Sequence, residues 1–245
     1  MRLDLALVER GLAPTRARAR DAVRRGAVRV DGRPARKAGE EVDAAATLDL
    51  DDPAARYVSR AALKLLAGLD AFGLDVAGAR TLDLGASTGG FTQVLLERGA
   101  AHVTALDVGH GQLAPDLARD PRVTAIEGRN ARDLRERDLP HPPDLVVADV
   151  SFISLRLALP PALALAVPGA RCVALVKPQF EAGRERIGKG GLVAHDVAGR
   201  VAGELRDWLD GMPDWRSLGL VPSPITGGDG NREWLLGGAK DAAHG

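Results

Sequence analysis

The chain has 245 residues, of which 45% are hydrophobic and 27% charged, a composition typical of a folded globular protein and not of a disordered or fibrous one. Its 33 basic and 33 acidic residues cancel, so the net charge by itself indicates no polyanionic partner. The single cysteine, Cys172, excludes a disulfide framework and a thiolate metal site, and its apolar surroundings in the sequence favour a reduced core position.

Neither a secretory signal nor a membrane span is evident. Charged residues interrupt the first ten positions, and uncharged stretches fall short of the roughly 18–20 residues that a membrane-spanning helix needs. The five histidines show no spacing typical of metal ligands. We therefore expect a soluble cytoplasmic protein that binds neither a membrane nor a metal ion.

Along the chain, the charge is unevenly distributed. Residues 10–37 hold ten basic and two acidic side chains, whereas residues 40–52 hold six acidic side chains and no basic one. The first segment is dense enough in positive charge to attract phosphate groups locally.

The first 50 residues predict a small α+β module. Its elements, in chain order, are helices over 4–10 and 16–25 and strands over 27–30 and 46–50. Thr15 is a typical N-cap for the second helix, and the pair Asp31-Gly32 is typical of a tight turn after the first strand.

Three arginines of the second helix, Arg16, Arg20 and Arg24, recur every four residues and share one face. An arginine stripe of this kind is often only a solvated helix face. Here a basic strand and turn follow it, and a larger domain comes after, so we favour contact with RNA phosphates. Nothing in the module indicates the dimeric half-site geometry of a DNA-binding helix.

Residues 51–59 are predicted to link this module to a larger domain over 60–245. Apolar strands alternate there with helical patterns, which favours a doubly wound, mostly parallel α/β sheet. The expected strands are 81–84, 103–106, 123–126, 145–148 and 172–176, with a helix over 91–98. Two last strands, 215–221 and 233–236, have no helix between them and predict an antiparallel edge.

A glycine turn follows the first of these strands, in the run T-L-D-L-G-A-S-T-G-G-F-T over 81–92. Such a turn lets backbone N–H groups approach a ligand, but its spacing fits neither the dinucleotide fingerprint nor a phosphate loop. Asp107 closes the next strand, where a carboxylate can accept hydrogen bonds from both ribose hydroxyls of an adenosine. The combination favours S-adenosylmethionine over NAD; the alternative is an ordinary turn and a solvated aspartate.

At this point the chain resembles the TlyA family, once called haemolysins, which are rRNA 2′-O-methyltransferases related to the FtsJ type. The first 50 residues resemble the S4-type RNA-binding module, and further motifs carry the family resemblance through almost all of the remaining chain: S-R-A-A-L-K-L at 59–65, L-G-A-S-T-G-G-F-T at 84–92, D-V-G-H-G-Q-L at 107–113, A-D-V-S-F-I-S at 148–154, V-K-P-Q-F-E at 176–181 and G-N-R-E-W at 230–234. The resemblance implies a Rossmann-like methyltransferase sheet, S-adenosylmethionine as donor, and a cytidine ribose of ribosomal RNA as acceptor.

The resemblance also implies a catalytic set of four residues, hereafter the tetrad: Lys64, Asp149, Lys177 and Glu233. The residues expected to hold the cofactor are Asp83, Gly85, Ala86, Ser87, Thr88, Gly89, Gly90, Phe91, Asp107, Asn130 and Asp149. The amide of Asn130 can contact adenine or cap the helix that follows it.

The chain contains 28 arginines and only 5 lysines, yet Lys64 and Lys177 fall at the ends of segments that form the site. A guanidinium stays protonated, whereas burial and like charges can lower an ammonium's pKa until the amine acts as a base. We therefore expect Lys177 to position the ribose 2′-hydroxyl or to accept its proton, with Asp149 and Glu233 orienting it and Lys64 tuning the charge. The alternative is a structural ion-pair network.

Further RNA contacts are expected at Arg60 and Arg132, either of which can equally be a surface arginine. Phe152 is expected either to stack on a flipped base or to pack in the core. The glycine-rich run over 180–191 is expected to be a mobile loop that orders on RNA.

Three other functions compete with this prediction. An amino-methyltransferase typically has an Asn/Asp-Pro-Pro-aromatic run where this chain has Asp149-Val150-Ser151-Phe152. A non-catalytic RNA-binding protein would not need the complete tetrad, and a haemolysin would need a membrane-inserting segment.

Because the chain starts almost directly at the S4-like module, the resemblance favours large-subunit 23S rRNA over 16S. The sequence does not indicate an oligomeric state.

Overall fold

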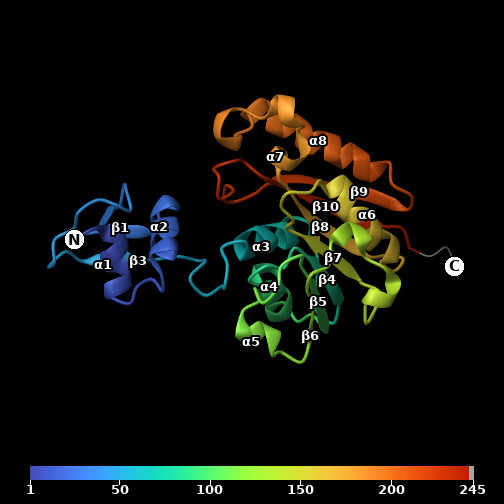
Figure 1. Cartoon of the computed structure of the whole chain (residues 1–245), viewed down its shortest axis with the longest axis horizontal. Helices are drawn as coiled ribbons and strands as arrows, with labels where there is room; N and C mark the ends of the chain where they lie inside the picture. Colours follow the sequence, from blue (N-terminus) through green and yellow to red (C-terminus); the bar gives the residue numbers. More distant parts are fainter. Residues whose placement is uncertain (243–245) are drawn as a thin grey trace. The chain divides into compact units, whose positions relative to one another are not determined.

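The structure is a computed structural model that describes residues 1–242, and it divides into two compact units between Arg56 and Tyr57 (Figure 1). This division falls inside the predicted linker over 51–59. The first half of that stretch packs on the N-terminal unit, because Arg25 binds the Asp52 carboxylate at 2.6 Å. The N-terminal unit therefore extends beyond the predicted boundary at residue 50.

The N-terminal unit has the predicted α+β composition. Its elements are α1 (Leu3–Glu9), α2 (Arg16–Arg24), β1 (Val28–Val30), β2 (Arg33–Pro34) and β3 (Leu48–Leu50), with an antiparallel sheet in the order β2-β1-β3. The hydroxyl of Thr15 accepts a hydrogen bond from the Arg18 N–H at 3.2 Å and so caps α2, as predicted. Asp31 and Gly32 have φ of 50° and 75°, which the tight hairpin turn between β1 and β2 requires.

One buried carboxylate ties the two helices of this unit together. Asp4, in the first turn of α1, accepts hydrogen bonds from Arg2 at 3.1 Å, from Arg16 at 3.1 Å and from Arg20 at 2.9 Å. These bonds, that of Arg2 above all, hold the pKa of Asp4 well below its usual value. Two arginines of the predicted RNA-binding stripe therefore also fix α2 against α1.

The C-terminal unit is a seven-stranded sheet in the order β6-β5-β4-β7-β8-β10-β9. The strands are β4 (Arg80–Leu84), β5 (His102–Leu106), β6 (Val123–Ile126), β7 (Leu145–Ala148), β8 (Arg171–Val176), β9 (Trp215–Pro222) and β10 (Trp234–Lys240). The five strands from β6 to β8 are parallel, and the hairpin of β9 and β10 adds an antiparallel edge. This confirms the predicted α/β fold; the last strand begins one residue later and runs four residues further than expected.

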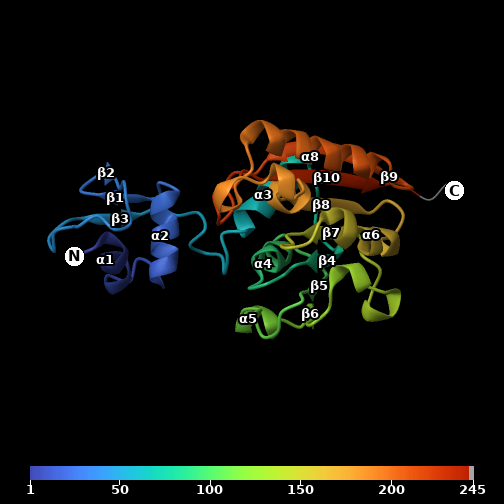
Figure 2. The ribbon, with the colours of Figure 1, turned by 45° about the horizontal axis from the view of Figure 1, so that its top comes forward.

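Helices cover both faces of the sheet (Figure 2). The helices are α3 (Ala62–Ala71), α4 (Gly90–Glu97), α5 (Pro115–Ala118), α6 (Leu155–Leu165), α7 (Pro178–Glu181) and α8 (His195–Asp210). Side chains of a strand alternate between its two faces: Val146 and Ala148 of β7 join the core under α6 and α8, and Leu145 and Val147 join the core under α3 and α4. Burial on both sides explains why this strand reads as a continuous apolar run.

The topology brings four chain segments to one edge of the sheet. Gly85, Asp149 and Lys177 each follow the carboxyl end of a parallel strand, and such ends meet at one edge. Because β10 runs in the opposite direction, its first residue, Trp234, pairs with Val176 at the end of β8. Glu233, the residue before Trp234, therefore lies at the same edge as the carboxyl ends of the parallel strands.

In the described part of the chain, 1–242, no helix has the length and apolar character needed to cross a membrane.

Replacing Asp4 with asparagine should loosen the contact between α1 and α2, because three guanidinium groups lose their ionic partner. A hydrogen bond to a charged group contributes on the order of 1–3 kcal/mol, and we expect a loss of this size in local stability. Hydrogen exchange of the full chain should then accelerate at the amides of α1 and α2. Asp49→Asn, an exposed change in β3, is the control; equal protection in both variants would contradict the role of Asp4.

Candidate active site and cofactor cavity

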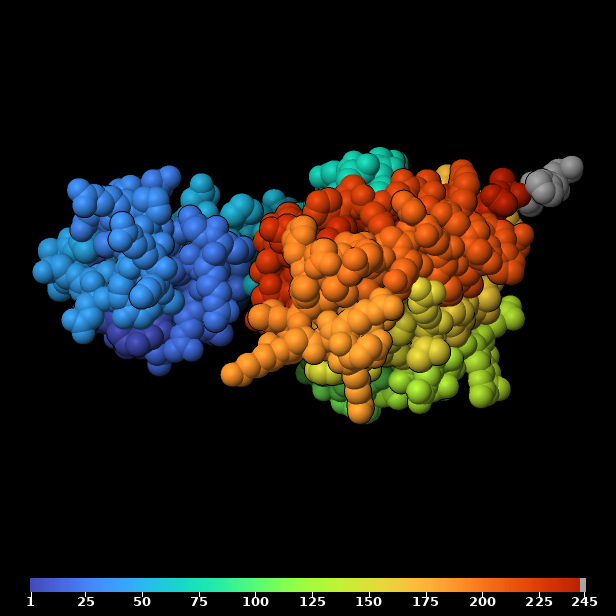
Figure 3. Space-filling model, turned by 90° about the horizontal axis from the view of Figure 1, so that it is seen from above, coloured from blue at the N-terminus to red at the C-terminus, as the bar shows by residue number. Residues whose placement is uncertain are grey.

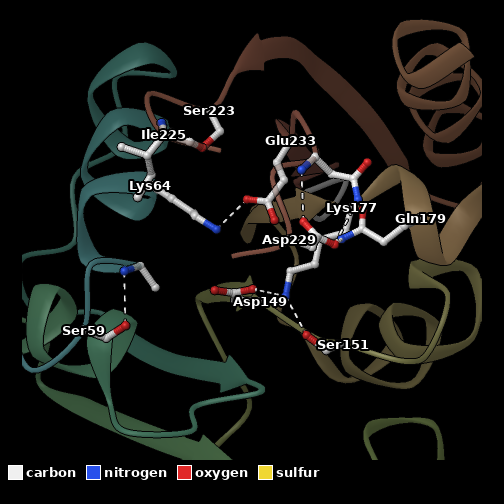
Figure 4. A network of polar contacts seen from close by, with 12 residues as sticks. Ser59, Lys64, Asp149, Ser151, Lys177, Gln179, Ser223, Ile225, Asp229 and Glu233 are labelled. Atoms are coloured by element: carbon white, nitrogen blue, oxygen red, sulfur yellow. Dashed lines mark hydrogen bonds and ion pairs between the residues drawn. The ribbon is translucent and has the colours of Figure 1, made fainter. Parts of the chain in front are cut away.

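Lys177 lies at the carboxyl end of β8 and is held by two neighbours on the adjacent strand end. Its ammonium Nζ lies 2.6 Å from Oδ1 of Asp149 and donates a hydrogen bond to the Ser151 hydroxyl at 2.8 Å (Figure 4). Both partners follow β7, the strand that pairs with β8. The parallel register therefore places this ion pair without any long loop.

Lys64 and Glu233 form a second ion pair, at 2.5 Å, with both side chains almost completely buried. Lys64 projects from the first turn of α3, which packs on β8 and β10, and Glu233 immediately precedes β10. Burial raises the pKa of Glu233, and the Lys64 ammonium opposes that rise. A buried charge of either sign here needs its partner.

The two ion pairs lie side by side (Figure 4). Asp149 raises and Lys177 lowers the pKa of Glu233, which shows that the pairs are close enough to interact. The structure thus brings the four residues of the predicted tetrad together. The site therefore contains two cationic and two anionic side chains, and their charges cancel at this edge of the sheet.

Asn231 is a residue of the site that the sequence analysis did not single out. Its side-chain oxygen accepts a hydrogen bond from Val193 N–H at 2.9 Å, and its amide donates to the Gly191 carbonyl and to Asp229, each at 2.9 Å. Asp229 in turn accepts from Gln179 beside Lys177 (Figure 4). Asn231 therefore joins three segments around Glu233; nothing in the sequence indicated this, since all three partners are distant or in loops.

Two adjoining cavities lie beside the Lys177–Asp149 pair. The large cavity, about 470 Å³, is lined by Gly85, Ser87, Asp107, Asn130 and Asp149 of the predicted cofactor residues. The small cavity, about 180 Å³, adds Ala86, Thr88, Gly90, Phe91 and Lys177. The cavities share residues of the glycine turn and of the β7 end, so one ligand can extend through both.

Gly85 makes this approach possible. Its φ is 82°, and a Cβ atom there would lie 2.6 Å from the carbonyl oxygen of Asp149. Only glycine permits the turn after β4 to pass so close to the end of β7.

Asp83 and Gly89 line neither cavity, so their predicted direct contact with a cofactor is not supported. Asp83 is completely buried behind the turn, where it accepts a hydrogen bond from the Thr92 hydroxyl at 2.7 Å. Burial raises the pKa of Asp83 to about 7, against the opposing effect of Thr92. Gly89 is the N-cap of α4 and faces Leu113 and Leu117.

The Asp107 carboxylate is oriented by two backbone groups. It accepts hydrogen bonds from Ser87 N–H and Gly109 N–H, each at 2.8 Å, and it faces the large cavity. Asn130 lines the same cavity and also caps the 3-10 turn over Ala131–Asp133 by accepting from the Arg132 N–H. Both alternatives considered for Asn130 are therefore compatible with its position.

The residues present fit an adenosine-containing cofactor. The large cavity combines an acid at the end of β5, an amide after β6 and apolar walls from Leu106, Val108 and Ile153. No phosphate-binding glycine loop accompanies them, which matches the chemistry of S-adenosylmethionine better than that of a dinucleotide.

Phe152 does not pack in the core, so that alternative is wrong. Its side chain is 92% exposed, and its φ of 64° is unusual for an aromatic residue. The ring lies at the rim of the large cavity, with its centroid 5.1 Å from that of Phe180. A strained, exposed aromatic at a cavity rim is typical of a ligand contact.

The segment 180–191 has more local structure than the predicted loop. Phe180 and Glu181 belong to α7, short 3-10 turns cover Arg184–Arg186 and Lys189–Gly191, and Ile187 forms a β-bridge with Val193. In Figure 3 part of this orange segment protrudes from the surface.

The remaining arginines predicted to bind RNA differ in exposure. Arg24 and Arg132 are exposed, and Arg132 has only a loose contact of 3.6 Å with Asp133. Arg60 is half-buried near Gly228, in the loop that leads to Glu233. In the part of the chain that the structure describes, no group of three or more acidic, histidine or cysteine side chains is arranged to hold a metal ion.

Comparison with known families agrees with this geometry. The S4 domain family matches residues 1–48, and the FtsJ-like methyltransferase family matches residues 57–240, which include the whole tetrad and both cavities. The chain belongs to the FtsJ-like methyltransferase family. The two matches correspond to the two units of the structure, and the resemblance to the TlyA family is confirmed.

Individual relatives cover most of the chain. The 16S/23S rRNA (cytidine-2'-O)-methyltransferase TlyA of Mycobacterium tuberculosis is 48% identical, over 96% of this chain and 88% of its own length. The 23S rRNA (cytidine-2'-O)-methyltransferase TlyA of Campylobacter jejuni is 36% identical, over 77% of this chain and 73% of its own. A solved structure from Streptococcus thermophilus that carries a hemolysin name is 41% identical, with a TM-score of 0.76 over 98% of this chain and 88% of that one.

Asp83→Asn should flatten the pH dependence of stability. With a pKa of about 7 in the folded protein against 3.8 as the ordinary value, Asp83 stays protonated on folding while the unfolded chain loses its proton. The free energy of unfolding therefore falls as pH rises through this window, by roughly 4 kcal/mol at most. Asparagine retains an acceptor for Thr92 and does not ionise.

The measurement is urea denaturation of both proteins from about pH 4 to pH 8, with the exposed change Asp116→Asn as control. The stability of Asp83→Asn relative to the original protein should increase with pH. A constant difference across the range would contradict the assignment.

Proposed function

We propose that this protein transfers a methyl group from S-adenosylmethionine to the 2′-hydroxyl of a cytidine in ribosomal RNA. The observation that carries the proposal is the Lys177–Asp149 ion pair at the wall of the cofactor cavity, beside the buried Lys64–Glu233 pair. The names of the relatives from Mycobacterium tuberculosis and Campylobacter jejuni support the substrate.

The cofactor would be held by Asp107, Asn130 and the backbone of the glycine turn, whose residues line the two cavities. When bound, S-adenosylmethionine supplies an electrophilic methyl group. The small cavity is the part that borders Lys177, so the reacting end of the cofactor belongs there. The protein's remaining task is to hold the ribose hydroxyl in line and to remove its proton.

Lys177 is the group that contacts the acceptor hydroxyl. An ammonium has three N–H donors; one of them donates to Ser151, and the charge is paired with Asp149. A further N–H of Lys177 remains for the 2′-oxygen. To act as the base, Lys177 first releases one proton of its ammonium to solvent. The neutral amine then accepts the proton of the 2′-hydroxyl as that oxygen bonds to carbon.

Lys64 and Glu233 act on this centre through charge and position. Their pair closes one side of the site, and its two opposite charges leave the field at Lys177 nearly balanced. The buried Glu233 carboxylate can also accept a hydrogen bond from the substrate on its other oxygen, because Oε2 is the atom that meets Lys64.

The RNA contacts come from both units. The N-terminal S4 domain offers Arg24 and the outer N–H groups of Arg16 and Arg20, and the methyltransferase unit offers Arg60 and Arg132. Phe152 provides an exposed ring at the cavity rim on which the target base can stack once it has left its helix. These contacts are sequence-tolerant apart from the target pocket, as is usual for phosphate and stacking interactions.

Among ribosomal RNAs, 23S is the preferred target in this proposal and 16S is a second one. The relative from Mycobacterium tuberculosis is named for both 16S and 23S rRNA, and the relative from Campylobacter jejuni is named for 23S rRNA alone. The 23S rRNA is therefore the substrate that the two names share. A ribosomal substrate also implies that the protein acts in the cytoplasm.

Replacing Lys177 with alanine should reduce methyl transfer to 23S rRNA by about 10²–10⁴-fold, the usual contribution of a positioned acid–base group. The matched variant Lys177→Arg keeps the positive charge but cannot accept a proton, so it should be similarly impaired. The measurement is incorporation of labelled methyl groups, with calorimetric binding of S-adenosylmethionine as the control for an intact cavity.

Cofactor affinity should stay within about threefold of the original protein, well under the tenfold that corresponds to 1.4 kcal/mol. Near-normal methylation by Lys177→Arg would overturn the role of proton acceptor. Full activity of Lys177→Ala would remove Lys177 from the reaction altogether.

A further inference from the structure

A third cavity, about 350 Å³, has Glu233 in its lining. We call it the hairpin cavity, because the loop between β9 and β10 and the start of α8 form it. It shares no residue with the two cofactor cavities, and Glu233 is its only member from the tetrad. Its occupant can therefore contact Glu233 without entering the cofactor cavities.

The lining of the hairpin cavity is partly apolar. Its apolar part consists of the half-buried indole of Trp234, the side chain of Ile225, Pro222 at the end of β9 and Pro224 of the loop. The Ser223 hydroxyl donates to the Ile225 carbonyl at 2.7 Å and so fixes this part of the loop (Figure 4). A cavity with an indole in its wall can accept a planar ring, and a nucleobase is such a ring.

The rim of the hairpin cavity is cationic. Arg232 is exposed, and within residues 1–242 no carboxylate forms an ion pair with it. Its Nη1 lies 2.5 Å from Nε2 of His195 on α8, a contact that orients the guanidinium. A guanidinium has five N–H donors, so several remain for an external anion. Arginine in this setting matches the geometry of a phosphate group.

We propose that the hairpin cavity binds the nucleotide next to the target cytidine, with its base against Trp234 and its phosphate on Arg232. The inference rests on the proposed function, because an RNA strand whose target ribose contacts Lys177 must place a neighbouring nucleotide beside Glu233. An anionic strand meets the unpaired guanidinium, and a base fills a slot that no side chain of this unit occupies.

The test uses neutral methylphosphonate linkages in an rRNA fragment, placed on either side of the target cytidine one at a time. At one of the two positions the original protein should lose about 10- to 100-fold in kcat/KM, the equivalent of a charged hydrogen bond. Arg232→Ala should lose a similar factor on the unmodified fragment and then be insensitive to that linkage. Arg216→Ala, an exposed change at the opposite end of the same hairpin, is the matched control and should follow the original protein on both RNAs.

The outcomes separate the two proposals. If the original protein methylates the unmodified fragment, the proposed function stands and the cavity is tested on its own. Independent, multiplicative losses from Arg232→Ala and from each linkage would overturn the hairpin cavity as a nucleotide site. No methylation of any fragment or of ribosomal subunits by the original protein would instead refute the proposed function.

Discussion

The site depends on one electrostatic constraint: two lysines and two carboxylates lie close together at a largely buried sheet edge, and none of them can stay charged there alone. Lys177 is paired with Asp149 and Lys64 with Glu233, so each charge has its partner. The pairs come from four separate segments, and the sheet register fixes them: β7 beside β8 supplies one pair, and α3 on the antiparallel β10 supplies the other. The order of the strands therefore determines which charged side chains meet at the site.

Much of this arrangement was predictable, because it follows from local patterns. Apolar strands such as 145–148, the cap at Thr15 and the glycine turn at Gly85 all have signatures within a few residues. The tetrad was predictable only through the family resemblance. What escaped prediction depends on contacts between distant segments: the binding of Arg16 and Arg20 to Asp4, and the bonds of Asn231 to Gly191 and Val193. The exposure of Phe152 and the burial of Asp83 likewise depend on tertiary packing that no short motif encodes.

Although the net charge of the chain is zero, the two units use their basic residues differently. Arginines of the N-terminal unit divide their hydrogen bonds between Asp4, which fixes the helices, and the solvent side, where phosphates can bind. In the methyltransferase unit two of the four lysines, Lys64 and Lys177, belong to the tetrad. The cofactor cavities and the hairpin cavity share no residue and border different members of the tetrad, so our two proposals give the donor and the RNA separate cavities.

The central claim is that this protein methylates a cytidine ribose of ribosomal RNA, and mapping 2′-O-methylation tests it most directly. Both large ribosomal RNAs would be compared nucleotide by nucleotide in cells with and without the protein. We predict that a 2′-O-methylcytidine in 23S rRNA disappears without the protein and returns when it is restored, but not when the Lys177→Ala form is supplied. Identical ribose methylation in all three conditions would contradict the account.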